Sequence, residues 1–178
     1  MRSATLITAL YYIAAAIFFS TLVLQLFSVF GFDLTSLLPP PDQVSTTTAP
    51  EAYFVLPILA ACAPLALILW LGGRISAKGL SHSEAGVKNL LGISFVYSAL
   101  NTAYALIRLH GGDVHGAGGL HFLRNGEGDT LLSPAEYHRD MALTMSYFMS
   151  WAMMIILFLA VAYRDWLREL NEPAIPSH

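Results

Sequence analysis

Apolar residues in this chain gather into four long stretches that polar segments separate. The stretches cover residues 4–30, 53–71, 90–109 and 142–163, and Arg108 is the only charged residue within them. The hydrocarbon core of a bilayer is about 30 Å thick, which about 20 helical residues can cross. The pattern therefore predicts an all-α integral membrane protein, a four-transmembrane-helix antiparallel bundle that forms a single domain over residues 1–178.

The fourth stretch lies inside a longer predicted helix. Ser133-Pro134-Ala135-Glu136 has the sequence of a capping box, in which the Ser and Glu side chains satisfy free backbone N–H groups at a helix start. Pro173 cannot continue a helix, so the helix should end just before it. We expect it to run from Ser133 to about Leu170 and to extend into water at both ends.

The connecting segments carry further local signals. Pro57 and Pro64 lie in the second stretch and predict a bent helix. Ser81 and Glu84 form a second capping box, which predicts the start of the third helix. Residues 110–132 are rich in glycine and histidine and predict an irregular loop between the third and fourth helices.

The basic residues predict the orientation in the membrane, because Lys and Arg concentrate on the cytoplasmic side. With four spans, most of them lie on the side of the two termini, and the first loop contains none. The third loop departs mildly from this pattern. We therefore expect both termini inside and the histidine-rich loop outside, external or periplasmic, in a plasma or inner membrane. The basic residues on the terminal side are Arg2, Arg74, Lys78, Lys88, Arg164 and Arg168.

Composition supports a membrane protein and narrows the function. Only 12% of the residues are charged, against about 25% in soluble domains. The net charge is −3 and no basic stripe is present, so nucleic acid is not an expected partner. Cys62 is the single cysteine, which excludes an intramolecular disulfide and a CxxC redox pair.

Polar residues inside the first helix share one face. Thr21, Gln25 and Ser28 follow a spacing of four and three residues, which places them on the same side of a helix. Polar side chains in a membrane helix usually contact other helices rather than lipid. We expect this face to point into the bundle.

The third helix has the most polar face of the four. Asn101 lies near its middle, and we expect it to form hydrogen bonds to a neighbouring helix. Together with the first helix, it provides the predicted polar intramembrane face, which consists of Gln25, Tyr97, Asn101, Tyr104 and Arg108.

A methionine stripe on the fourth helix is the sharpest pattern of possible chemistry. Met141, Met145, Met149 and Met153 are four residues apart, and His138 precedes them by one turn. Thioethers suit Cu(I), and the M-x-x-x-M repeat resembles, in that feature alone, the methionine pair of copper uptake channels. The other interpretation is packing, since methionine fills irregular cores.

Histidines in the third loop are the second candidate for metal binding. His110, His115 and His121 lie there and His138 follows at the start of the last helix, which supplies ligands for copper or another transition metal. Solvated histidines and a pH-responsive cap are the alternatives. All histidines lie outside the apolar stretches, so no intramembrane pair is available to bind haem b.

The sequence lacks the G-x-S-x-G, H-E-x-x-H and phosphate-loop motifs, which argues against ordinary membrane enzymology but leaves open a site shared with a partner. The leading hypothesis is a non-catalytic accessory subunit or assembly factor of a larger membrane complex. Its partners would be the lipid bilayer and other membrane subunits or further copies of the chain. A copper-handling membrane protein is the alternative, and a small oligomeric channel lined by Asn101 is the third hypothesis.

Overall fold

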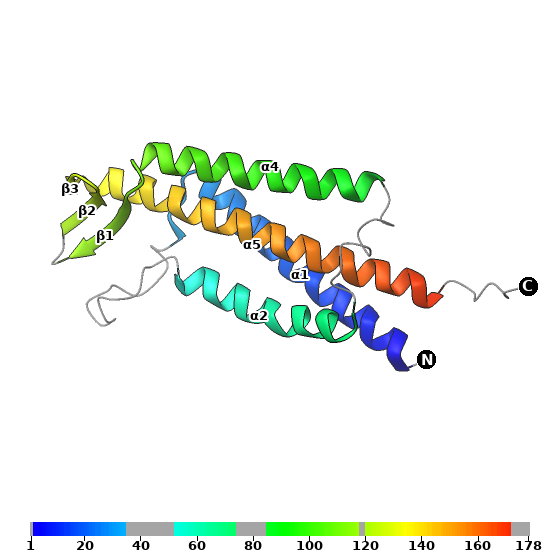
Figure 1. Ribbon diagram of the computed structural model, residues 1–178. Coiled ribbons are helices and arrows are strands. Elements are labelled where there is room, and N and C mark those ends of the chain that lie inside the picture. The colour runs from blue at the N-terminus through cyan, green and yellow to red at the C-terminus, as the bar shows by residue number, and fades with distance from the viewer. Residues whose placement is uncertain (1, 35–51, 74–84, 118–119, 172–178) are drawn as a thin grey trace, which may run out of the picture.

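The structure of the chain is a computed structural model that describes residues 2–34, 52–73, 85–117 and 120–171. Its elements are four helices and a small sheet between the last two (Figure 1). The helices are α1 (Arg2–Val29), α2 (Ala52–Leu71), α4 (Ala85–Arg108) and α5 (Pro134–Asn171), and the strands are β1 (Asp113–Ala117), β2 (Leu120–Asn125) and β3 (Gly128–Leu132).

Helix α5 is the centre of the bundle. The helices α1, α2 and α4 all pack against it, and α2 and α4 lie on opposite sides of it (Figure 1). In the most apolar part of α5, 61% of the residues are buried, against 22% in α1 and 17% in α4. The outer faces of the other helices are consequently free to contact lipid.

Within the described residues, three helices are long and apolar enough to cross a membrane, namely Ala4–Val29, Ala85–Arg108 and Pro134–Asn171. This supports the prediction of a helical membrane protein. In α2 the described apolar segment, Leu56–Leu71, is shorter than these three. The fourth span therefore stays a prediction.

The start of α5 has the geometry that the capping box predicts. The Glu136 carboxylate accepts hydrogen bonds from the Ser133 backbone N–H at 2.9 Å and from its hydroxyl at 2.7 Å. The backbone N–H of Glu136 donates in return to Ser133 Oγ at 3.3 Å. The predicted extent of this helix is confirmed to within a residue or two at either end.

The main apolar core joins α1, α2 and α5. Ile7 and Ala14 of α1, Leu69 of α2 and Ile156 of α5 are all buried in it. A polar contact adds to this packing, because the Tyr163 hydroxyl donates to the Leu65 carbonyl at 2.7 Å. Helix α2 is thus held against α5 by both kinds of contact.

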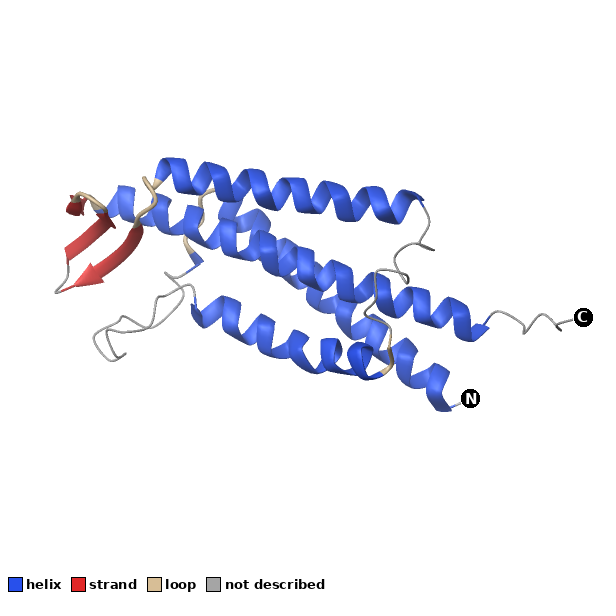
Figure 2. Ribbon diagram, in the orientation of Figure 1, coloured by secondary structure: helices blue, strands red, loops and turns tan. Residues whose placement is uncertain are grey.

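The expectation of an irregular loop over residues 110–132 is wrong, and the chain is not entirely helical. Strands β1, β2 and β3 form an antiparallel sheet in that order, at the end of the bundle opposite the start of α1 (Figure 2). His115, expected in a loop, is paired with Phe122 across β1 and β2. Gly128 begins β3 with a φ of 125°, a conformation that suits glycine.

The sheet forms because its short strands place apolar residues on the face that α5 covers. Val114 and Leu123 are directly paired and buried, and they pack with Leu109 and Met141. A five- or six-residue strand can bury a face this way only when another element covers it. Helix α5 supplies that cover, which is why the glycine-rich sequence alone predicted no strands.

Two other predictions are not decided by the structure. The second capping box, at Ser81 and Glu84, lies outside the described residues. Pro57 and Pro64 both lie within α2. The bend they predict stays a prediction.

Candidate functional site

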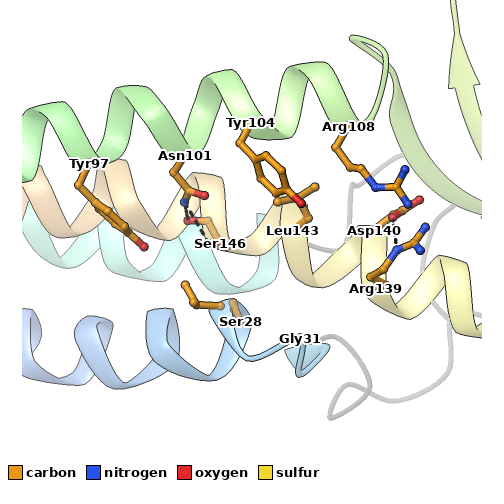
Figure 3. Close-up of a pocket in the computed structure, with 11 residues that line it drawn as sticks. Ser28, Gly31, Tyr97, Asn101, Tyr104, Arg108, Arg139, Asp140, Leu143 and Ser146 are labelled. Carbon is orange, nitrogen blue, oxygen red and sulfur yellow. Dashed lines mark hydrogen bonds and ion pairs between the residues drawn. The ribbon is translucent and has the colours of Figure 1, made fainter.

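A network of hydrogen bonds between side chains links α1, α4 and α5. Gln25 is 2% exposed, and its Nε2 donates to the Tyr97 hydroxyl at 2.7 Å and to Ser146 Oγ at 3.0 Å. Asn101 Nδ2 donates to the carbonyl oxygen of Ser146 at 2.9 Å and to its Oγ at 3.0 Å (Figure 3). The predicted interhelical bonds of Asn101 are confirmed, and the predicted burial of Thr21, Gln25 and Ser28 is confirmed as well.

A second row of bonds joins α4 to α5 only. The Ser98 hydroxyl donates to the Ser150 carbonyl at 2.9 Å, and Trp151 Nε1 donates to Thr102 Oγ1 at 2.7 Å. Without water in a bilayer, such bonds satisfy polar groups that would otherwise be costly to bury. Helix α4 is therefore fixed on α5 by polar contacts as well as by the apolar cluster of Val87, Leu157 and Val161.

Next to this network, a cavity of about 340 Å³ opens between α1, α4 and α5. Tyr97, Tyr104 and Arg108 point from α4 toward the other two helices (Figure 3). The cavity lies toward the sheet end of the bundle. The residues that line it are Ser28, Val29, Gly31, Tyr97, Asn101, Tyr104, Arg108, Arg139, Asp140, Leu143 and Ser146.

Three charged residues occupy one end of the cavity. Arg139 Nε lies 2.9 Å from Asp140 Oδ1, and Asp140 is 4% exposed. Arg108 also lines this end and is exposed. Glu136 also faces both guanidinium groups, and its hydrogen bonds with Ser133 together with their charges lower the pKa of its carboxyl group, so two carboxylates balance the two guanidinium groups. Arg108 has no ion-pair partner among the described residues, so its guanidinium group is the one that can contact an anion.

Two buried polar atoms beside the cavity have no hydrogen-bond partner among the described residues. They are Ser28 Oγ, in a side chain that lines the cavity, and Gln25 Oε1, one turn earlier in α1. Most buried polar atoms in proteins are satisfied. A cavity with an unsatisfied hydroxyl in its wall is the site at which a ligand would gain a hydrogen bond.

Methionines predicted as metal ligands lie in two separate apolar clusters. Met141 packs in the core under the sheet, whereas Met145 and Met149 pack with Leu34 in a separate cluster. All three are fully buried among apolar side chains, as the packing interpretation expects. Among the residues that the structure describes, no group of three or more His, Cys, Asp or Glu side chains has the arrangement of a metal site. The copper hypothesis stays a prediction, which elemental analysis of the purified protein can test.

The histidines lie in different surroundings. His138 Nδ1 is 2.7 Å from Asp33 Oδ2, which connects the segment after α1 to the first turns of α5. The His121 ring stacks on Tyr137 with the ring centroids 3.9 Å apart. His110 is exposed in the turn after α4, with a φ of 51°. The structure thus shows His138 and His121 in contact with protein groups rather than with one another.

On the sheet, a hydrogen bond and ion pair with Asp129 raise the pKa of Arg124. Arg124 Nε and Asp129 Oδ1 are 3.0 Å apart, in a directly opposed pair of β2 and β3. This pair crosslinks the two strands and leaves the charge balance of the cavity unchanged.

Sequence reasoning missed part of the site. The sequence did not predict that the cavity would be lined by Ser28, Arg139 and Ser146. It also did not identify Asp33 as the partner of His138. Ser146 lies within the methionine stripe region of α5 and looks like an ordinary small residue there. An available signal was its one-turn spacing from Ser150, because small polar residues mark helix contacts in membranes.

Comparison of the chain with protein-family models, with curated proteins and with solved structures gave no match.

Proposed function

We propose that this protein is a non-catalytic accessory subunit or assembly factor of a larger membrane complex. In this proposal α2 is a fourth span, both termini are inside, and the sheet lies on the outer side of the membrane. The arrangement in Figure 1 supports the proposal, since α1 begins and α5 ends at the end of the bundle away from the sheet. A chain that crosses the membrane an even number of times has both of its termini on the same side.

The observation that carries the proposal is the outward face of the sheet. Val114, Leu123 and Leu132 of the sheet belong to the apolar cluster that packs against α5. Leu131 is paired with Phe122 on the opposite face, and Leu131 is 61% exposed.

Leu120, two residues before Phe122 in β2, shares that outward face and is 53% exposed. A small antiparallel sheet normally turns a polar face to water. Exposed apolar residues on an extramembrane sheet instead mark a surface for another protein. The outer edges of β1 and β3 pair with no other strand among the described residues, so a partner strand can add there.

The test compares Leu131→Ser with Leu170→Ser, both purified from native membranes in a mild detergent. Leu170 is a 42% exposed leucine in the last turn of α5, so it is a matched control at the far end of the bundle. We expect the proteins that co-purify with the wild type to be lost from Leu131→Ser and retained by Leu170→Ser. Thermal unfolding of both variants checks that neither has lost its fold.

A wild-type chain that purifies as a monomer with no other protein would contradict the proposal. Equal co-purification by the two variants would also contradict it, because the outward face of the sheet would then have no part in binding.

A further inference from the structure

The cavity between α1, α4 and α5 has an uneven distribution of polarity along its length. Arg108, Arg139 and Asp140 lie at the end near the sheet, whereas Tyr97 and Asn101 lie deeper in the apolar part of α4. From Tyr97 to Arg108 the helix rises by about 16 Å. The cavity is thus elongated, charged at one end and less polar at the other.

Its hydrogen-bonding groups at the deeper end are donors as well as acceptors. The Tyr97 hydroxyl oxygen accepts the bond from Gln25, so its own O–H proton is available to donate. Ser28 contributes a buried hydroxyl without a partner among the described residues. Such groups bind ester, phosphate or glycerol oxygens.

We propose that this cavity binds the phosphate-bearing head of an anionic phospholipid from the membrane leaflet on the sheet side. Arg108 contacts the phosphate, Arg139 stays paired with Asp140, and the hydroxyls of Tyr97, Tyr104 and Ser28 contact the glycerol and ester region. The acyl chains stay in the bilayer, against the lipid-exposed sides of α1 and α4.

Size and position favour a lipid over a free anion. The volume of about 340 Å³ lies within the range of about 300–1,000 Å³ that is typical of small-molecule sites. An inorganic phosphate would occupy only the charged end and would leave Ser28 and Tyr97 without a ligand contact. Tyr104 is 60% exposed, so the side of the cavity is accessible from the bilayer.

The inference goes beyond the proposed accessory role, and it is tested on the purified chain alone, so its outcome is independent of any protein partner. Binding of phosphatidylglycerol is measured by native mass spectrometry of the protein in neutral detergent, with phosphatidylcholine and inorganic phosphate as comparison ligands. We expect saturable binding of phosphatidylglycerol, weaker binding of phosphatidylcholine, and no displacement by inorganic phosphate.

Arg108→Gln should weaken phosphatidylglycerol binding by about tenfold or more, as expected for the loss of one charge-assisted contact. Lys88→Gln is the matched control, because it removes a positive charge from the same helix at the end away from the cavity. It should leave the affinity unchanged.

Ser28→Ala separates binding from folding. Because Ser28 Oγ has no partner among the described residues, its removal should leave thermal stability unchanged in lipid-free detergent. It should weaken phosphatidylglycerol binding by about threefold to tenfold, the equivalent of one neutral hydrogen bond.

Three results would overturn the proposal. Equal losses in Arg108→Gln and Lys88→Gln would show that lipid is attracted only by surface charge. Equal binding of phosphatidylglycerol and phosphatidylcholine would show that the anionic head is not recognised. Displacement by inorganic phosphate would show that the ligand is a free anion.

Discussion

Ser146 contacts two helices at once through a single hydroxyl. Its Oγ accepts hydrogen bonds from Gln25 of α1 and Asn101 of α4, each at 3.0 Å. Both amides have another acceptor, the Tyr97 hydroxyl for Gln25 and the Ser146 carbonyl for Asn101. The Ser146 hydroxyl therefore strengthens the contacts of α5 with α1 and α4, but each amide keeps another acceptor without it.

We expect Ser146→Ala to lower the free energy of unfolding by about 1 kcal/mol, because membrane hydrogen bonds contribute about 0.6 kcal/mol each. Ser150→Ala is the control, since the Ser150 hydroxyl donates only to the Tyr147 carbonyl of its own helix. Reversible unfolding in mixed micelles measures both variants. Equal losses would show that the interhelical bonds of Ser146 contribute nothing.

At this scale the sequence predicted which residues are polar and buried but not which residues they contact. The spacing of Thr21, Gln25 and Ser28 correctly predicted an inward face. The two partners of Gln25, Tyr97 and Ser146, are 72 and 121 residues away in the chain. No local pattern contains that information.

At the scale of elements, the ends of α5 depend on short-range signals. The reciprocal bonds between Ser133 and Glu136 satisfy backbone groups that have no partner within the helix. The signal spans only four residues, so it could be recognised in the sequence. The sheet depends instead on contact with α5, which is distant in the chain from β1.

Glu136→Ala should lower the stability of the first turn of α5 by about 0.5–1 kcal/mol. Glu127→Ala is its control, because Glu127 is exposed in the turn between β2 and β3 and its backbone bond to Asn125 survives the change. Amide hydrogen exchange in residues 134–140 measures the effect. Unchanged exchange in Glu136→Ala would contradict the role of the capping box.

At the scale of the whole molecule, the length of α5 separates the two sides of the membrane. Its 38 residues extend over about 57 Å, which exceeds the thickness of a bilayer. The sheet before it and the chain after it therefore lie on opposite sides if α5 crosses. The position of the N-terminus then depends on whether α2 crosses as well.

The proposed layout predicts the labelling of single cysteines in a Cys62→Ala background. A membrane-impermeant maleimide should label Glu127→Cys in intact cells and Glu169→Cys only after permeabilisation. A tag at the N-terminus should behave like Glu169→Cys, because four spans place both termini on one side. An N-terminal tag that is accessible in intact cells, as Glu127→Cys is expected to be, would show that α2 does not cross the membrane.

The sequence by itself determined that the chain belongs in a membrane, where its long helices run and where the last of them begins. These properties depend on residues that are close together in the sequence, so they can be predicted without knowledge of tertiary contacts. Tertiary structure alone decided that Ser146 receives both amides, that Val114 and Leu123 become strand residues, and that Arg108 meets Arg139 and Asp140. Each of these depends on packing against α5, which brings together residues that are far apart in the chain.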